Sequence, residues 1–139
     1  MTESRGPLSI LIVDDSPEQL RLLVRIVEKE GYVARPITSG KLALEAALAD
    51  PPELVLLDIK MPEMSGLEVC RLFKKDPSLK EIPIIFVSVL HDIVEKMAAF
   101  EAGGVDFIPK PFHEPEVIAR IKAHVKIKHL QEALQAQLK

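Results

Sequence analysis

The chain has 139 residues, 47% of them hydrophobic and 28% charged, and its formal net charge is −3. This balance is typical of a single globular domain and excludes a disordered or fibrous chain. A weakly acidic chain also lacks the overall positive charge that draws proteins to nucleic acid or to anionic membranes, so we expect neither as a direct partner.

The amino terminus and the single cysteine bear on where the protein works. Residues 1–7 are polar, lack the apolar core of a secretory signal, and are expected to be a disordered segment. No apolar run approaches the ~20 residues that a membrane-spanning helix needs. Cys70 has no partner for an intrachain disulfide, which is typical of a buried thiol in a reducing compartment. We therefore expect a cytoplasmic protein.

Five short apolar runs alternate with five segments of helical periodicity. The expected strands cover residues 8–13, 33–37, 54–57, 83–87 and 105–108. The expected helices begin after Ser16 and Ser65, cover residues 39–48 and 92–102, and begin near Pro115. Ser16 and Ser65 are followed three residues later by Gln19 and Glu68, which is the capping-box spacing of a helix start.

The order of these elements predicts an α/β fold. Strands that are apolar along their whole length are typical of a parallel sheet covered on both faces. Right-handed crossovers between such strands favour a doubly wound arrangement. We therefore expect a five-stranded parallel sheet in a three-layer α/β/α sandwich.

Polar side chains follow the expected strands at the edge where ligands bind in such folds. Asp14 and Asp15 follow the first strand, Asp58 the third, Ser88 the fourth and Lys110 the fifth. Two carboxylates ~4 Å apart repel by about 4 kcal/mol at an effective dielectric near 20, so a cluster of three favours a bound cation. Hard oxygen ligands suit Mg²⁺ or Mn²⁺ better than zinc.

The four histidines are too scattered in the sequence for a metal site, and we interpret them as surface residues. They are His91, His113, His124 and His129.

Four motifs at the strand ends resemble the signatures of the response regulator receiver family. They are IVDDS (12–16), LLDIKMPEMSGLE (56–68), FVSV (86–89) and DFIPKPF (106–112). They occur in the order found in that family, and the resemblance covers residues 8–126. It implies a flavodoxin-like sandwich with the strand order 2-1-3-4-5.

The resemblance also implies a phosphorylation site that contains a metal ion. Asp58 would be the nucleophile and phosphoacceptor, forming an aspartyl phosphate. Asp15 and Asp58 would ligate Mg²⁺ directly, together with the backbone carbonyl of Lys60. Asp14 would hold the ion through a water molecule.

The remaining motif residues would sense and transmit the modification. Lys110 would pair with a phosphoryl oxygen and Ser88 would bond to another, while Phe107 would change rotamer with Ser88. The Lys110–Pro111 bond resembles one that is usually cis in the family. These roles imply a switch of a two-component system. It would be phosphorylated by a sensor histidine kinase or phosphotransfer protein and would act on a partner or output domain.

Two other functions remain as alternatives. One is an Asp-nucleophile phosphohydrolase, which would carry an Asp-x-Asp pattern after its first strand, whereas Asp14 and Asp15 are adjacent. The other is a phosphorylation-independent scaffold, against which the intact Asp15, Asp58 and Lys110 argue. On the leading interpretation the domain is regulatory, with self-catalysed phosphoryl transfer and slow autodephosphorylation as its only chemistry.

Helix-forming residues continue past the expected end of the receiver domain, so residues 127–139 are expected to form an extension or linker. Five residues of the last helix, four of them apolar, recur at alternating four- and three-residue steps, as in a short coiled coil. These residues, called the seam below, are Ala123, Ile127, Leu130, Leu134 and Gln137. Two interpretations stay open: a homodimer through this last helix, or an exposed tail with a solvated basic face.

Overall fold

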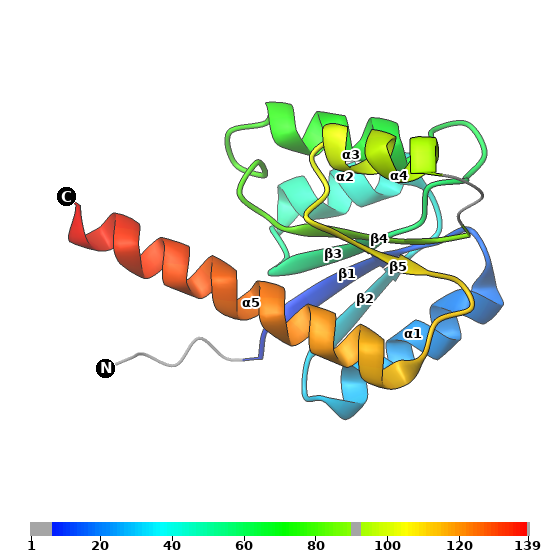
Figure 1. Cartoon of the computed structure of the whole chain (residues 1–139), viewed down its shortest axis with the longest axis horizontal. Coiled ribbons are helices and arrows are strands. Elements are labelled where there is room, and N and C mark those ends of the chain that lie inside the picture. Colours follow the sequence, from blue (N-terminus) through cyan, green and yellow to red (C-terminus); the bar gives the residue numbers. More distant parts are fainter. Residues whose placement is uncertain (1–6, 90–92, 139) are drawn as a thin grey trace.

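Five parallel strands lie between two layers of helices in the computed structural model of the chain, which describes residues 7–89 and 93–138 (Figure 1). The strands are β1 (Ser9–Val13), β2 (Val33–Ile37), β3 (Leu54–Leu57), β4 (Ile84–Ser88) and β5 (Asp106–Pro109). The helices are α1 (Pro17–Lys29), α2 (Gly40–Ala49), α3 (Gly66–Lys75), α4 (Ile93–Glu101) and α5 (Glu114–Gln137). The sheet order β2-β1-β3-β4-β5 confirms the expected fold. Residues 1–6 of the expected disordered segment, His91, and Asp92 at the expected start of α4 lie outside the described residues.

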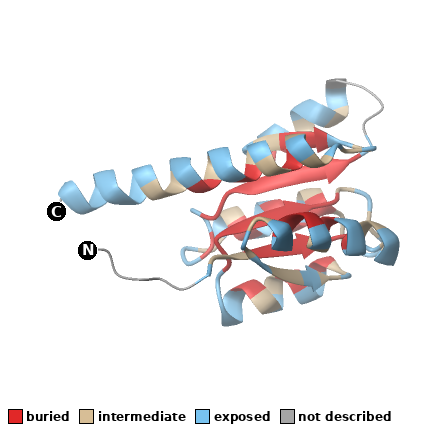
Figure 2. Cartoon of the chain, turned by 90° about the horizontal axis from the view of Figure 1, so that it is seen from below, coloured by how far each residue is buried: buried red, intermediate tan, exposed pale blue. Residues whose placement is uncertain are grey.

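The alternation of side chains along the strands divides the core into two clusters. Ile10 and Ile12 of β1 pack on the side that α1 and α5 cover. Leu11 and Val13 pack on the other side, beneath α2, α3 and α4. Because successive side chains of a strand point to opposite faces, a strand buried on both faces must be apolar throughout. Figure 2 shows buried residues along the central strands β1, β3 and β4, whereas the edge strand β2 has none.

Two serines start helices close to the carboxyl edge of the sheet. The Ser16 hydroxyl accepts a hydrogen bond from the backbone amide of Gln19, 3.3 Å away. Ser65 and Glu68 form the complete capping box that the sequence predicts. These caps satisfy amides that the first turn of a helix leaves free.

Gly66 allows α3 to begin directly against the segment that follows β3. Its amide donates a 2.8 Å hydrogen bond to the carbonyl of Ile59. A Cβ atom at this position would collide with the backbone carbonyl of Asp58. The close approach therefore requires glycine.

The helix α5 is anchored to the sheet over its first half only. Val117, Ile121 and Val125 are its buried residues. Among residues 126–138 none is buried, and this part of the helix extends past the body of the domain (Figures 1 and 2).

Replacing Gly66 with alanine should cost about 3 kcal/mol of unfolding free energy, because the added Cβ forces the backbone beside Asp58 to move. Gly31→Ala is the matched control. Gly31 has φ +90° but open space around it, so only the backbone penalty of about 1 kcal/mol applies. Urea unfolding of both variants measures the difference, and equal losses would contradict the steric explanation.

Candidate functional site

Carboxylate, ammonium and hydroxyl groups meet at the carboxyl edge of the sheet. Asp14 and Asp15 follow β1, Asp58 follows β3, Ser88 ends β4 and Lys110 follows β5. Asp14 and Asp58 are only 1% and 7% exposed, and Ser88 is also buried, whereas Asp15 faces solvent. Oxygens of the three carboxylates lie within 4.8 Å of one another. The fold therefore brings these residues together, as the sequence predicts.

Lys110 links two of the carboxylates. Its Nζ donates a 2.8 Å hydrogen bond to Oδ2 of Asp14 and lies 3.6 Å from Oδ2 of Asp58. The other oxygen of Asp14, Oδ1, accepts a 2.9 Å hydrogen bond from the amide of Ser16 at the start of α1. A single ammonium group thus forms ion pairs with two buried carboxylates.

Backbone hydrogen bonds between neighbouring strands hold the site residues in place. The amide of Asp58 donates to the carbonyl of Val13 at 2.9 Å, and that of Lys110 donates to the carbonyl of Ser88 at 3.0 Å. The amide of Asp14 donates to the carbonyl of Ile37 at 3.1 Å. The site is therefore an extension of the sheet and not part of a free loop.

The surroundings of Asp58 disfavour its negative charge. Burial raises the pKa of the Asp58 carboxyl, and the neighbouring charge of Asp14 raises this pKa further. Lys110, the Ser88 hydroxyl and the Ile59 amide act in the opposite direction without cancelling the effect. A group that brings positive charge to the site would relieve this repulsion.

The donor set of the site fits a hard divalent cation. Three carboxylates with converging oxygens match the ligands that Mg²⁺ or Mn²⁺ prefers, and the cluster contains no thiolate or imidazole. The side chain of Lys60 is directed to α4, where its Nζ lies 3.8 Å from Glu95.

Phe107 lies in the core behind the site. It is 5% exposed and belongs to the cluster that includes Phe86, Ala99 and Ala102, and it pairs with Phe86 across the sheet. In this structure the aromatic ring of Phe107 is therefore directed inward.

The peptide bond between Lys110 and Pro111 is cis.

The interpretation of all histidines as surface residues is wrong for His124, whose side chain is 16% exposed and has Nε2 2.9 Å from Oδ2 of Asp106. The side chain of His129 is 38% exposed and has Nε2 2.7 Å from Oε2 of Glu53. Packing of α5 brings both histidines over the amino-terminal edge of the sheet, a contact that sequence periodicity does not reveal. Sequence reasoning also missed Glu53, for which the only signal was a charged residue immediately before an apolar strand.

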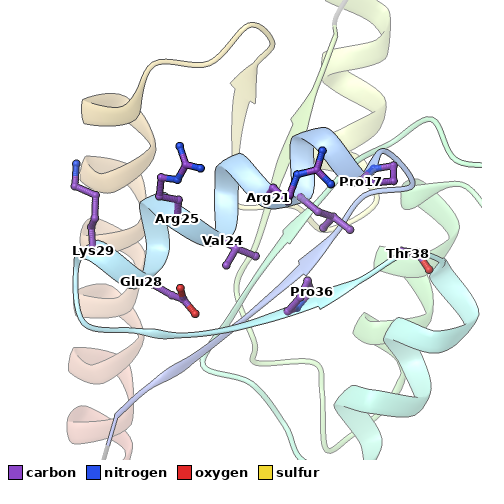
Figure 3. A pocket seen from close by; sticks show the side chains of 9 residues that line it. Pro17, Arg21, Val24, Arg25, Glu28, Lys29, Pro36 and Thr38 are labelled. Atoms are coloured by element: carbon purple, nitrogen blue, oxygen red, sulfur yellow. The ribbon is translucent and has the colours of Figure 1, made fainter.

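A cavity between α1 and β2 has a different character. Figure 3 shows Val24, Glu28, Pro36 and Thr38 among its lining residues, with the basic side chains of α1 beside them. It contains none of the clustered carboxylates.

Comparison with known proteins decides the family. The family model of the response regulator receiver domain matches residues 10–122. The chain belongs to this receiver family. It is accordingly a regulatory domain of the kind found in two-component response regulators.

Individual relatives agree with this assignment. The DNA-binding response regulator MtrA of Mycolicibacterium smegmatis is 35% identical over 117 residues, which are 84% of this chain and 50% of that protein. The response regulator PleD of Caulobacter vibrioides is 34% identical over 119 residues, 86% of this chain and 26% of that protein. The receiver domain of a signal transduction histidine kinase from Syntrophus aciditrophicus superposes with a TM-score of 0.75 at 36% identity, covering 87% and 89% of the two chains.

The receiver chain spans half or less of the length of these two response regulators. No helix among the described residues is long and apolar enough to cross a bilayer.

Asp58→Asn should raise the free energy of unfolding at neutral pH in a buffer that contains a chelator. A raised pKa in the folded state means that ionised Asp58 destabilises the fold above that pKa. The destabilisation by ionised Asp58 shrinks as the pH falls through the raised pKa of the folded state toward the pKa of the unfolded state. The difference in unfolding free energy between Asp58→Asn and the wild type should therefore narrow on acidification. Urea unfolding from pH 8 to pH 4 measures the gap. Asp50→Asn, remote from the site, is the control, and a gap that widens at low pH would contradict the electrostatic explanation.

Proposed function

We propose that Asp58 accepts a phosphoryl group from a sensor histidine kinase or phosphotransfer protein and that the domain works as a phosphorylation-dependent switch. The observation that carries this proposal is the buried Asp58 carboxylate, which lies beside Lys110, Ser88 and two further carboxylates. A buried carboxylate whose negative charge is disfavoured by burial and by a neighbouring carboxylate, and which lies next to a cation, is suited to nucleophilic attack on phosphorus.

In the transfer, a bond forms between a carboxylate oxygen of Asp58 and phosphorus, while the bond from phosphorus to the donor's histidine nitrogen breaks. Lys110 pairs with one oxygen of the transferred group, because its ammonium is already 3.6 Å from Asp58. The Ser88 hydroxyl donates to another oxygen. When bound, Mg²⁺ supplies further positive charge to these oxygens. Asp15, Asp58 and the Lys60 carbonyl would hold it directly, and Asp14 through water.

Ser88 and Phe107 are placed to transmit the change. Ser88 ends β4 and Phe107 lies on β5, so movement of the hydroxyl toward a phosphoryl oxygen alters the packing between these neighbouring strands and α4. The altered surface is then read by a partner or an output domain. This role is regulatory, with only self-catalysed transfer and slow autodephosphorylation as chemistry, and we place it in the cytoplasm, where the phosphoryl donors of the family act.

A second proposal concerns self-association through the last helix. In this proposal residues 8–126 are the receiver domain and residues 127–139 an extension or linker, in which α5 continues to Gln137. Leu130 and Leu134 are 61% and 58% exposed there, and their four-residue spacing places them on one face of the helix. The seam would bury them against a second copy.

Incubation with Mg²⁺ and a small acyl phosphate should add the mass of one phosphoryl group to the wild type and none to Asp58→Asn. Lys110→Ala should reduce labelling at least tenfold, because it removes the cation beside the transferred group. Asp50→Asn is a carboxylate control outside the site and should label like the wild type. Intact-mass spectrometry measures all four proteins, and equal labelling of Asp58→Asn would exclude this residue as the acceptor.

The double variant Leu130→Glu/Leu134→Glu should abolish self-association, because it places charges in the seam. Sedimentation velocity over a concentration series measures the dimer fraction of the wild type and the variant. Leu48→Glu alters a leucine on α2 that is 52% exposed and should leave the dimer fraction unchanged. A wild type that stays monomeric at every concentration would refute the association.

A further inference from the structure

Lys74, near the end of α3, is a half-buried lysine that the site at the carboxyl edge does not use. Its Nζ donates hydrogen bonds to the carbonyls of Lys80, 3.1 Å away, and Ile82, 2.9 Å away. Both carbonyls belong to the turn that joins α3 to β4. Within residues 7–89 and 93–138 no carboxylate forms an ion pair with this amine, so its partners there are two backbone carbonyls.

The rest of the Lys74 side chain is also held in place. A Cβ atom at Gly103, which follows α4, would lie 2.6 Å from Cγ of Lys74. The aliphatic part of the lysine therefore packs directly on the backbone of this glycine. A nucleophile that is already oriented in this way reacts without the entropy cost of ordering a flexible side chain.

The amine lies at a small cavity whose lining favours an anionic reagent. The cavity has a volume of about 200 Å³ and is formed where the turn after α3, the residue before β5 and the helix α5 meet. Lys80 and Lys128 line it beside Lys74, and Glu81 is the only acidic residue among the described residues of the lining. Because lysines outnumber carboxylates there, a reagent that carries a phosphate group is attracted to the cavity.

Burial also favours the reactive form of the amine. Desolvation lowers the pKa of Lys74, and the opposing effects of Cys70 and Glu81 do not cancel it. A neutral amine has two N–H groups and one lone pair. Because two carbonyls accept the two N–H groups, the lone pair is left free to attack an electrophile.

We propose that Lys74 is a site of acylation by small acyl phosphates. The amine nitrogen attacks the carbonyl carbon of the reagent, and a bond between nitrogen and carbon forms. The bond between that carbon and the phosphate oxygen breaks, inorganic phosphate leaves with the electron pair, and the nitrogen gives a proton to water. In the function proposed above, Asp58 attacks the phosphorus atom of the same reagent, so the two reactions give different products and neither requires the other.

Acylation would loosen the turn before β4. An acylated lysine cannot carry a positive charge and has a single N–H group, which can donate to only one of the two carbonyls. The turn formed by residues 76–82 therefore loses one of its contacts with α3.

Site-resolved mass spectrometry of the wild type after treatment with acetyl phosphate tests the proposal. Lys75 is the matched control, because it is the next residue of the same helix and is exposed. In the folded protein we expect acetylation of Lys74 to be at least about fivefold faster than that of Lys75, and in urea that unfolds the chain we expect similar rates. A Lys74 rate equal to or below that of Lys75 in the folded protein, or a ratio that persists in urea, would overturn the proposal.

The variant Asp58→Asn separates this reaction from phosphoryl transfer. It should gain no phosphoryl group, while Lys74 should be acetylated at the wild-type rate. A wild type that is acetylated at Lys74 but never phosphorylated would refute the function proposed for Asp58 and support the present inference. Phosphorylation of Asp58 without preferential acetylation of Lys74 would have the opposite meaning.

Hydrogen exchange tests the effect on the turn. Lys74→Gln removes the charge and shortens the side chain, so amides of residues 78–82 should exchange about threefold faster than in the wild type. Lys75→Gln makes the same change at the exposed neighbour and should leave these rates unchanged. Wild-type exchange in both Lys74→Gln and the acetylated protein would overturn the loosening of the turn.

Discussion

One lysine is shared between two buried carboxylates, and the rest of the site depends on this arrangement. Lys110 lies 2.8 Å from Asp14 and 3.6 Å from Asp58, while the exposed Asp15 adds a third negative charge nearby. A single ammonium group leaves the cluster negative. The site thus favours groups that bring positive charge, and burial and repulsion disfavour the ionised form of Asp58. This excess of negative charge follows from where the strands of the sheet end.

The sheet explains how such an unfavourable cluster persists. Asp14, Asp58 and Lys110 each follow a strand whose ladder of hydrogen bonds continues through the backbone of the residue itself. Two apolar clusters on opposite faces of the sheet stabilise those strands. The stabilisation from burying the apolar core therefore offsets the repulsion among the clustered carboxylates. Functional sites commonly hold residues that are not the most stable choice for the fold.

Much of this arrangement could be predicted from the sequence, because it depends on local patterns. Apolar runs and capping serines locate the strands and helices to within a few residues, and the acidic residues follow the strands in the order of the family motifs. The pairing of Lys110 with Asp14 and the close approach at Gly66 required the structure, because they depend on how elements pack. The contact between Glu53 and His129 joins residues 76 positions apart and leaves no periodic signal in the sequence. It depends on the rotation of α5, which is set by Val117, Ile121 and Val125 together.

The helix α5 connects the two polar clusters of the domain. It begins four residues after Lys110, at the carboxyl edge of the sheet, and reaches Glu53 at the opposite edge. The seam is already exposed in this structure, so no covering contact has to be released before it can pair. A change at the carboxyl-edge site can reach the seam through movement of α5. Glu53 is largely buried, so a movement that preserves its contacts costs less than one that breaks them. Such a movement would be a small displacement of the whole of α5. In a pair of chains it would change how the two seams are oriented, while both would stay accessible.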